Sequence, residues 1–149
     1  MRTAKYSAGG IDYLRTFGVV PNPEISDGYA ATMQSLEKLQ SALSANGYEF
    51  TDIVRTWFYN RDLLDWYADF NRARTEFFGK VGVFEKLLPA STGIGASNPK
   101  GAMLECGALA LKFAEVGVKT RYAREVPSPL QYEACGYGSS FSRAVEIPT

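Results

Sequence analysis

The apolar run at residues 102–112 (AMLECGALALK) constrains the fold more than any other part of the sequence. It follows a turn signal, Asn98-Pro99-Lys100-Gly101, and it is short, so we interpret it as a central β-strand. Successive side chains of a strand point to opposite faces, and here both faces carry apolar residues. If helices cover one face, something else must cover the other, and a second copy of the same chain is the simplest candidate.

Other segments have strand character as well. Residues 11–20 (IDYLRTFGVV) and 50–59 (FTDIVRTWFY) are rich in the branched and aromatic residues that strands favour. Residues 88–95 (LPASTGIG) are expected to lead into a further extended segment, and residues 116–122 are expected to form another strand. Between these strand-like segments lie two segments whose apolar residues recur with the period of a helix.

The first interruption is a helical pattern at residues 29–43, where apolar side chains recur every three or four positions. Ser26 or Asp27 is expected to cap its N-terminus. Asn46-Gly47 is expected to end it, because glycine accepts the left-handed conformation found after helices.

The second interruption is a helical stripe from Leu63 to Phe77, with Asp62 or Asp65 as its expected cap and Gly79 as its end. Two helices on one face of a mixed sheet make an α+β fold. At 149 residues the chain fits a single domain over residues 1–149, with residues 125–149 as a C-terminal tail.

Composition excludes several classes of function. Sixteen basic and sixteen acidic residues balance, so we expect no nucleic-acid partner, and no apolar run is long enough to cross a membrane. Histidine is absent, which excludes Ser-His-Asp and Cys-His catalysis and histidine-ligated zinc. Two separated cysteines, Cys106 and Cys135, favour a reducing, cytoplasmic setting. We expect no metal and no organic cofactor, and acid–base chemistry falls to Asp, Glu, Tyr, Cys or Lys.

Alternation along residues 54–59 separates two sets of side chains. The face expected to pack on the helices carries Val54, Thr56 and Phe58, and the opposite face carries Arg55, Trp57 and Tyr59. The second set would face the interior of an oligomer, where Arg55 could bind a carboxylate. The alternative is an arginine in ordinary interface packing.

Glu105 is expected on the same face of its strand as Met103, Leu109 and Leu111. A carboxylate among apolar neighbours is costly unless it is paired, so Glu105 is a candidate acid–base group. The alternative is a salt bridge across an interface, for example to Arg55.

The block RTWFYNRDLLDWYADFNRARTEFF, together with LPASTGIG, resembles the Rid (reactive intermediate deaminase) superfamily, also called the YjgF family. The resemblance covers residues 11–113. It implies a chorismate-mutase-like fold that assembles as a homotrimer around a barrel of sheets, with pockets for small carboxylated metabolites between subunits.

The family's Pro-x-Arg-Ser/Thr motif is altered here: Pro89 and Thr92 match, but Ser91 stands in the arginine position. The bidentate carboxylate clamp is therefore missing, which argues against ordinary imine deamination. The family's catalytic glutamate aligns with Gly107, and Glu105 lies two residues earlier.

A narrower resemblance links RTWFY, LPASTGIG and SPLQYEACGYGSSFSRA to the C-terminal half of the chorismatases, which implies a biosynthetic setting. The candidate catalytic residues are Glu105, Tyr59 and Cys135. The candidate substrate-binding residues are Arg55, Trp57, Ser91, Thr92, Gly93, Arg121 and Arg124.

Three functions follow from these patterns. The first is a cofactor-free enzyme, a hydrolase or lyase, that moves a proton or adds or eliminates water on a small carboxylate. The second is a non-catalytic module that binds a metabolite or a partner. A ribonuclease is the third, although no basic patch supports it.

Overall fold

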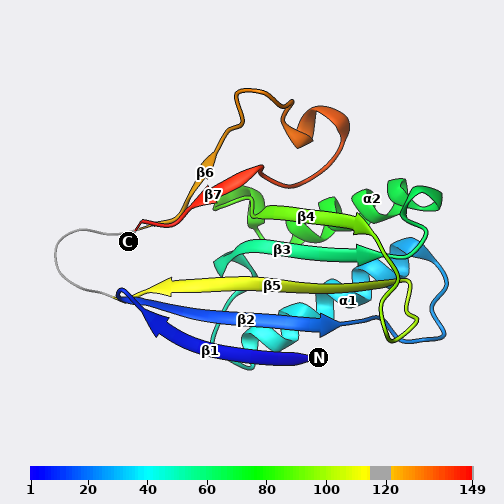
Figure 1. Cartoon of the computed structure of the whole chain (residues 1–149), viewed down its shortest axis with the longest axis horizontal. Helices are drawn as coiled ribbons and strands as arrows, with labels where there is room; N and C mark the ends of the chain where they lie inside the picture. Colours follow the sequence, from blue (N-terminus) through cyan, green and yellow to red (C-terminus); the bar gives the residue numbers. More distant parts are fainter. Residues whose placement is uncertain (115–121, 149) are drawn as a thin grey trace.

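The computed structural model describes residues 1–114 and 122–148. Five strands form one sheet in the order β1-β2-β5-β3-β4, and a two-stranded ribbon pairs β6 with β7 (Figure 1). The bounds of the strands are β1 Arg2–Ala8, β2 Ile11–Val19, β3 Ile53–Asn60, β4 Ala90–Gly95, β5 Leu104–Phe113, β6 Arg124–Val126 and β7 Ala144–Glu146. The predicted central strand is confirmed, since β5 lies between β2 and β3.

The two predicted helices are α1, Gly28–Ser44, and α2, Tyr67–Lys80. Both pack on the same side of the sheet, so the expected α+β arrangement is confirmed (Figure 1). The connection through α2 makes β3 and β4 parallel, whereas the other neighbouring strands of the sheet are antiparallel.

The main core fills the space between the helices and the sheet. Leu36, Leu39 and Leu43 of α1 and Phe70 and Phe77 of α2 are buried there. The sheet contributes the β5 side chains Leu104, Cys106, Ala108 and Ala110. Cys106 is therefore a core thiol, and burial raises its pKa to about 12.

The start of α1 follows the sequence closely. The Asp27 side chain accepts a hydrogen bond from the Ala30 amide at 2.7 Å, as its role as a cap predicts. The predicted stop is confirmed as well, because Gly47 adopts φ +81° just after the helix.

The start of α2 was predicted wrongly. Leu63–Asp65 forms a separate 3₁₀ turn, and the residue that precedes α2 is Trp66, which makes no capping hydrogen bond with its side chain. Neither Asp62 nor Asp65 caps the helix. Trp66 instead packs on Phe70 and donates its indole N–H to the Arg61 carbonyl at 2.8 Å, so packing fixes this start.

Two predicted positions on the strands also differ. Val54 packs with Ile11 and Leu111 on the sheet face away from the helices, because a β-bulge between Ile53 and Arg55 inserts one extra residue. Met103 precedes β5 and packs against the main core, not beside Leu109 and Leu111.

Strand β1 was not predicted, and all seven of its residues are exposed. The strand predicted at residues 116–122 lies, except for Tyr122, outside the described residues. The tail adds β6, β7 and a 3₁₀ turn, Ala134–Tyr137, beyond the β4 edge (Figure 1).

Candidate functional site

We call the side of the five-stranded sheet that α1 and α2 leave uncovered the open face. Alternation and the strand register give its central side chains. They are Tyr6, Tyr13, Arg15, Phe17, Arg55, Trp57, Tyr59, Glu105 and Leu109.

Trp57 lies between two guanidinium groups at the centre of the open face. The guanidinium carbon of Arg15 is 3.8 Å from the centroid of the Trp57 ring, and that of Arg55 is 5.2 Å from it. Both distances are within the range of a cation–π contact. Arg15 reaches Trp57 across β5, because β2 and β3 flank that strand on either side.

Neither arginine meets a carboxylate within the parts of the chain that the structure describes. Arg55 donates to the Thr92 hydroxyl at 2.6 Å, and Arg15 makes a long contact of 3.4 Å with the Thr16 carbonyl. Burial lowers the pKa of Arg15, although the nearby phenols of Tyr59 and Tyr6 act in the opposite sense. The cluster is thus cationic and aromatic.

Arg15 was missed by the sequence reading, although its pattern was visible. It alternates with Tyr13 and Phe17 along β2, and this places all three on one face. Phe17 is 38% exposed there, and Tyr6 stacks on Tyr13 with ring centroids 4.7 Å apart.

Glu105 lies on the open face beside Tyr59, its partner in the β3–β5 register. Arg55 pairs with Leu109, which is four positions further along β5 than Glu105, or roughly 13 Å of strand. The salt bridge considered from the sequence does not form within one chain. Among the described residues, no cation lies within ion-pair distance of Glu105.

The altered motif divides between the two faces of β4. Thr92 meets Arg55 on the open face, whereas Ser91 accepts a hydrogen bond from the buried Thr56 hydroxyl at 2.9 Å on the helix side. A Cβ built on Gly93 would have no atom within 4 Å, so the space beside it is free.

Gly107 has no room for a side chain. A Cβ there would lie 2.5 Å from the Thr16 carbonyl oxygen and 3.1 Å from the Phe17 Cα. The position that aligns with the family's glutamate is therefore closed by the neighbouring strand β2.

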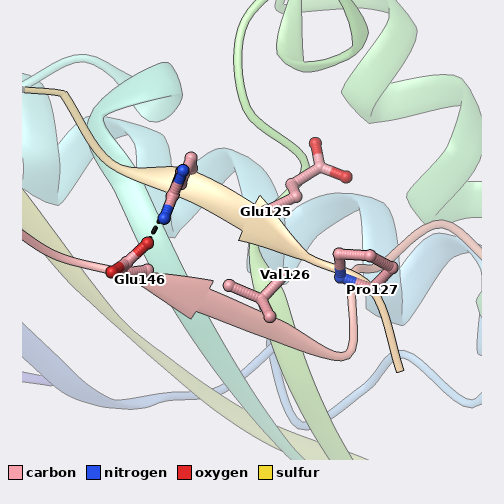
Figure 2. Close-up of a pocket in the computed structure, with 5 residues that line it drawn as sticks. Glu125, Val126, Pro127 and Glu146 are labelled. Atoms are coloured by element: carbon pink, nitrogen blue, oxygen red, sulfur yellow. Dashed lines mark hydrogen bonds and ion pairs between the residues drawn. The ribbon is translucent and has the colours of Figure 1, made fainter. Parts of the chain in front are cut away.

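The tail candidates lie elsewhere. Arg124 pairs with Glu146 across β6 and β7. Both residues line a pocket of about 570 Å³ together with Glu125, Val126 and Pro127, which Figure 2 labels beside Glu146. The guanidinium of Arg124 thus already has a carboxylate partner. Arg121 lies outside the described residues.

Cys135 is exposed in the 3₁₀ turn of the tail. The tail reaches one end of the open face, where Val145 and Ile147 pack against the cluster of Ile11, Val54 and Leu111. The structure therefore brings Arg55, Trp57, Tyr59, Thr92 and Glu105 onto one surface and leaves Cys135, Ser91 and Arg124 apart from it.

Residues 1–114 and 122–148 hold no group of three or more Cys, Asp or Glu side chains that could bind a metal ion. In the same ranges, no helix has the length and the apolar character needed to cross a membrane.

Comparison with known proteins gives a consistent result. A family model described as endoribonuclease L-PSP matches residues 5–114. The RutC family protein PH0854 of Pyrococcus horikoshii is 30% identical over 108 residues, which are 72% of this chain and 78% of that protein.

Two solved structures have the same fold. The YjgF gene product of E. coli has a TM-score of 0.60 and 26% identity, over 72% of this chain and 85% of that one. HI0719 of Haemophilus influenzae, described as a hypothetical protein, has a TM-score of 0.61 and 29% identity, over 72% and 84% of the two chains.

Proposed function

Because this chain belongs to the endoribonuclease L-PSP family, which is the YjgF/Rid family, we propose that it binds a small carboxylated metabolite on the open face. In this proposal the open face is completed by further copies of the chain, as a homotrimer, and the ligand lies at the contact between subunits. The observation that carries the proposal is the pair of arginines around Trp57, neither of which has a carboxylate partner among the described residues.

A carboxylate ligand suits this cluster for two physical reasons. A guanidinium donates two parallel N–H groups to the two oxygens of a carboxylate, and such charge-assisted bonds are stronger than neutral ones. The Trp57 ring and the aliphatic side chain of Leu109 offer an apolar surface to the body of the ligand. Arg55 thus takes the role of the arginine that Ser91 replaces.

The chemistry we propose is proton transfer, or addition or elimination of water, without a metal or an organic cofactor. Glu105 is the proposed acid–base group, and Tyr59, its neighbour in the register, is the proposed proton donor. Ordinary imine deamination is not proposed, because Ser91 stands where the Rid motif has its carboxylate-binding arginine and Gly107 stands where the resemblance places the catalytic glutamate.

A binding function without catalysis is the second candidate. It is favoured by the same two positions, because the chain has lost both the motif arginine and the motif glutamate. A hydrolase or lyase reaction of the chorismatase type is compatible with the tail sequence and is tested in the same experiment.

The experiment is a melting-temperature screen with small keto acids, enamines and chorismate-like acids, followed by product analysis. The proposal expects a ligand-induced rise for the wild type, loss of that rise in R55M, and its retention in R72M, whose arginine is exposed on α2 and paired with Asp69 at 3.0 Å. E105Q should bind but not turn over. Shifts without turnover in the wild type would select the binding function, and equal shifts in R55M and wild type would overturn the site.

A further inference from the structure

Arg74 of α2 is an arginine buried without a counter-ion. It is 2% exposed, and no carboxylate lies within ion-pair distance of it in the described parts of the chain. Its Nη2 donates to the Asn71 side-chain oxygen at 2.7 Å, while its buried Nε–H has no partner there. Burial lowers its pKa to about 10, against the opposing effect of Tyr67 and Tyr137. An unpaired buried charge is costly, so this arrangement requires a reason.

A second arginine lies close by, in the tail. The guanidinium carbons of Arg74 and Arg143 are 5.3 Å and 5.1 Å from the centroid of the same ring, Phe141. Arg143 donates to the Tyr137 hydroxyl at 2.9 Å, and its Nε is also buried without a partner among the described residues. Both guanidinium groups therefore contact the ring of Phe141.

Two hydroxyl groups, of Ser139 and Tyr67, are hydrogen-bonded near Asn71, the partner of Arg74. Ser139 donates to the Asn71 oxygen at 2.7 Å and lies 3.2 Å from the Tyr67 hydroxyl. Burial opposes ionisation of Tyr67, but hydrogen bonds with Ser139 and Asn71 and the charges of Arg74 and Arg143 outweigh it and lower its pKa. The two guanidinium groups therefore favour the ionised form of Tyr67.

An approach from solvent exists between α2 and the tail. A groove of about 570 Å³ is lined by Tyr67, Asn71, Thr75, Tyr137 and Gly138, with Arg72 and Glu76 at its exposed side. Asn71 joins this groove to Arg74, since its side-chain oxygen accepts the Arg74 hydrogen bond. A carboxylate that displaces this neutral acceptor would replace a weak hydrogen bond with a charge-assisted one.

From these observations we infer that the junction of α2 and the tail, around Arg74, Arg143 and Tyr67, is a second binding site for a small aromatic monocarboxylate. The rings of Tyr67 and Tyr137, which line the groove, favour a flat ligand body. The carboxylate of Glu76 at the groove disfavours a dianion such as phosphate. This site lies on the helix side of the sheet and is separate from the open face.

The test is calorimetric titration of benzoate into R55M, which lacks the arginine of the open face. The site predicts saturable binding to R55M and to the control R55M/K80M, whose Lys80 is exposed at the end of α2 and does not line the groove. Binding should be weaker by about tenfold or more in R55M/R74M, which corresponds to ~1.4 kcal/mol. Inorganic phosphate should bind more weakly than benzoate. Benzoate affinity that is equal in R55M and R55M/R74M, or no binding to R55M, would overturn the inference.

Folding is controlled within the same experiment. Without ligand, R74M should melt at or above the wild-type temperature, because an apolar side chain replaces an uncompensated buried charge. If R74M does not fold, R55M/R143M decides: the site predicts weaker benzoate binding there, and unchanged binding contradicts it. This test compares variants that all carry R55M, so its result does not depend on the open-face proposal. That proposal is tested by comparing R55M with the wild type in the melting-temperature screen.

Discussion

Gly107 occupies a position on β5 that has no room for a side chain. Gly107 pairs with Trp57 of β3, and on its other side the Thr16 carbonyl of β2 lies close to it. The sequence reading identified Gly107 as the position that aligns with the catalytic glutamate, but the steric reason is visible only in three dimensions. The packing of β2 on β5 therefore excludes any side chain at Gly107.

The variant G107A tests this packing. Its Cβ would lie 2.5 Å from the Thr16 oxygen, so the strands must separate, and we expect a loss of about 1–3 kcal/mol in the free energy of unfolding. Urea denaturation measures it. The matched control is G93A on β4, where a Cβ would meet no atom within 4 Å, and its unfolding free energy should change much less. Equal stability of G107A and wild type would contradict the close approach of the strands.

At the residue level, the sequence predicted a large part of the open face. Alternation correctly placed Arg55 and Tyr59 with Trp57, because β3 is regular after its bulge. It failed for Val54, since a bulge adds a residue without any mark in the sequence. Arg15 was missed because its partner Trp57 belongs to a strand some forty positions away, and contacts across a sheet are set by strand order.

Elements were predictable where local chemistry determines them. The α1 helix begins at a residue with a capping side chain and ends near a glycine, so its bounds could be read from the sequence. The α2 helix has no such cap and begins where Trp66 packs, so tertiary contacts decide its start. Strand β1 has no buried residue and left no apolar pattern to detect.

The variants D27A and D65A test this contrast between the two helices. Asp27 caps α1 at 2.7 Å from the Ala30 amide, so D27A should cost about 1 kcal/mol of unfolding free energy. Asp65, which the sequence suggested as the cap of α2, makes no capping bond, so D65A should change stability by less than about 0.5 kcal/mol. Chemical denaturation of both variants compares them, and an equal loss would show that Asp65 has a capping role.

At the scale of the whole molecule, the apolar pattern of β5 by itself predicts the layers of the fold. Its helix-side residues Leu104 and Ala108 are fully buried in the main core. Among residues 1–114 and 122–148, the tail packs on the other face at the cluster that contains Leu111, and Phe17 and Tyr6 are partly exposed. Exposed aromatic side chains on one face of a small protein favour association, and they are the physical basis for the proposed trimer.

The variant F17D tests association through the open face. Phe17 is 38% exposed on that face, so an aspartate there would have to be desolvated in any assembly that buries it. We expect the wild type to have the mass of three chains by light scattering and F17D to shift toward the mass of one. The control is L130D, which changes a residue that is 93% exposed in the tail and should leave the mass unchanged. A wild type that is monomeric at all concentrations would contradict the trimer. A trimeric F17D with an unchanged dissociation constant would show that subunits meet elsewhere, and the carboxylate site on the open face would then have to function within one chain.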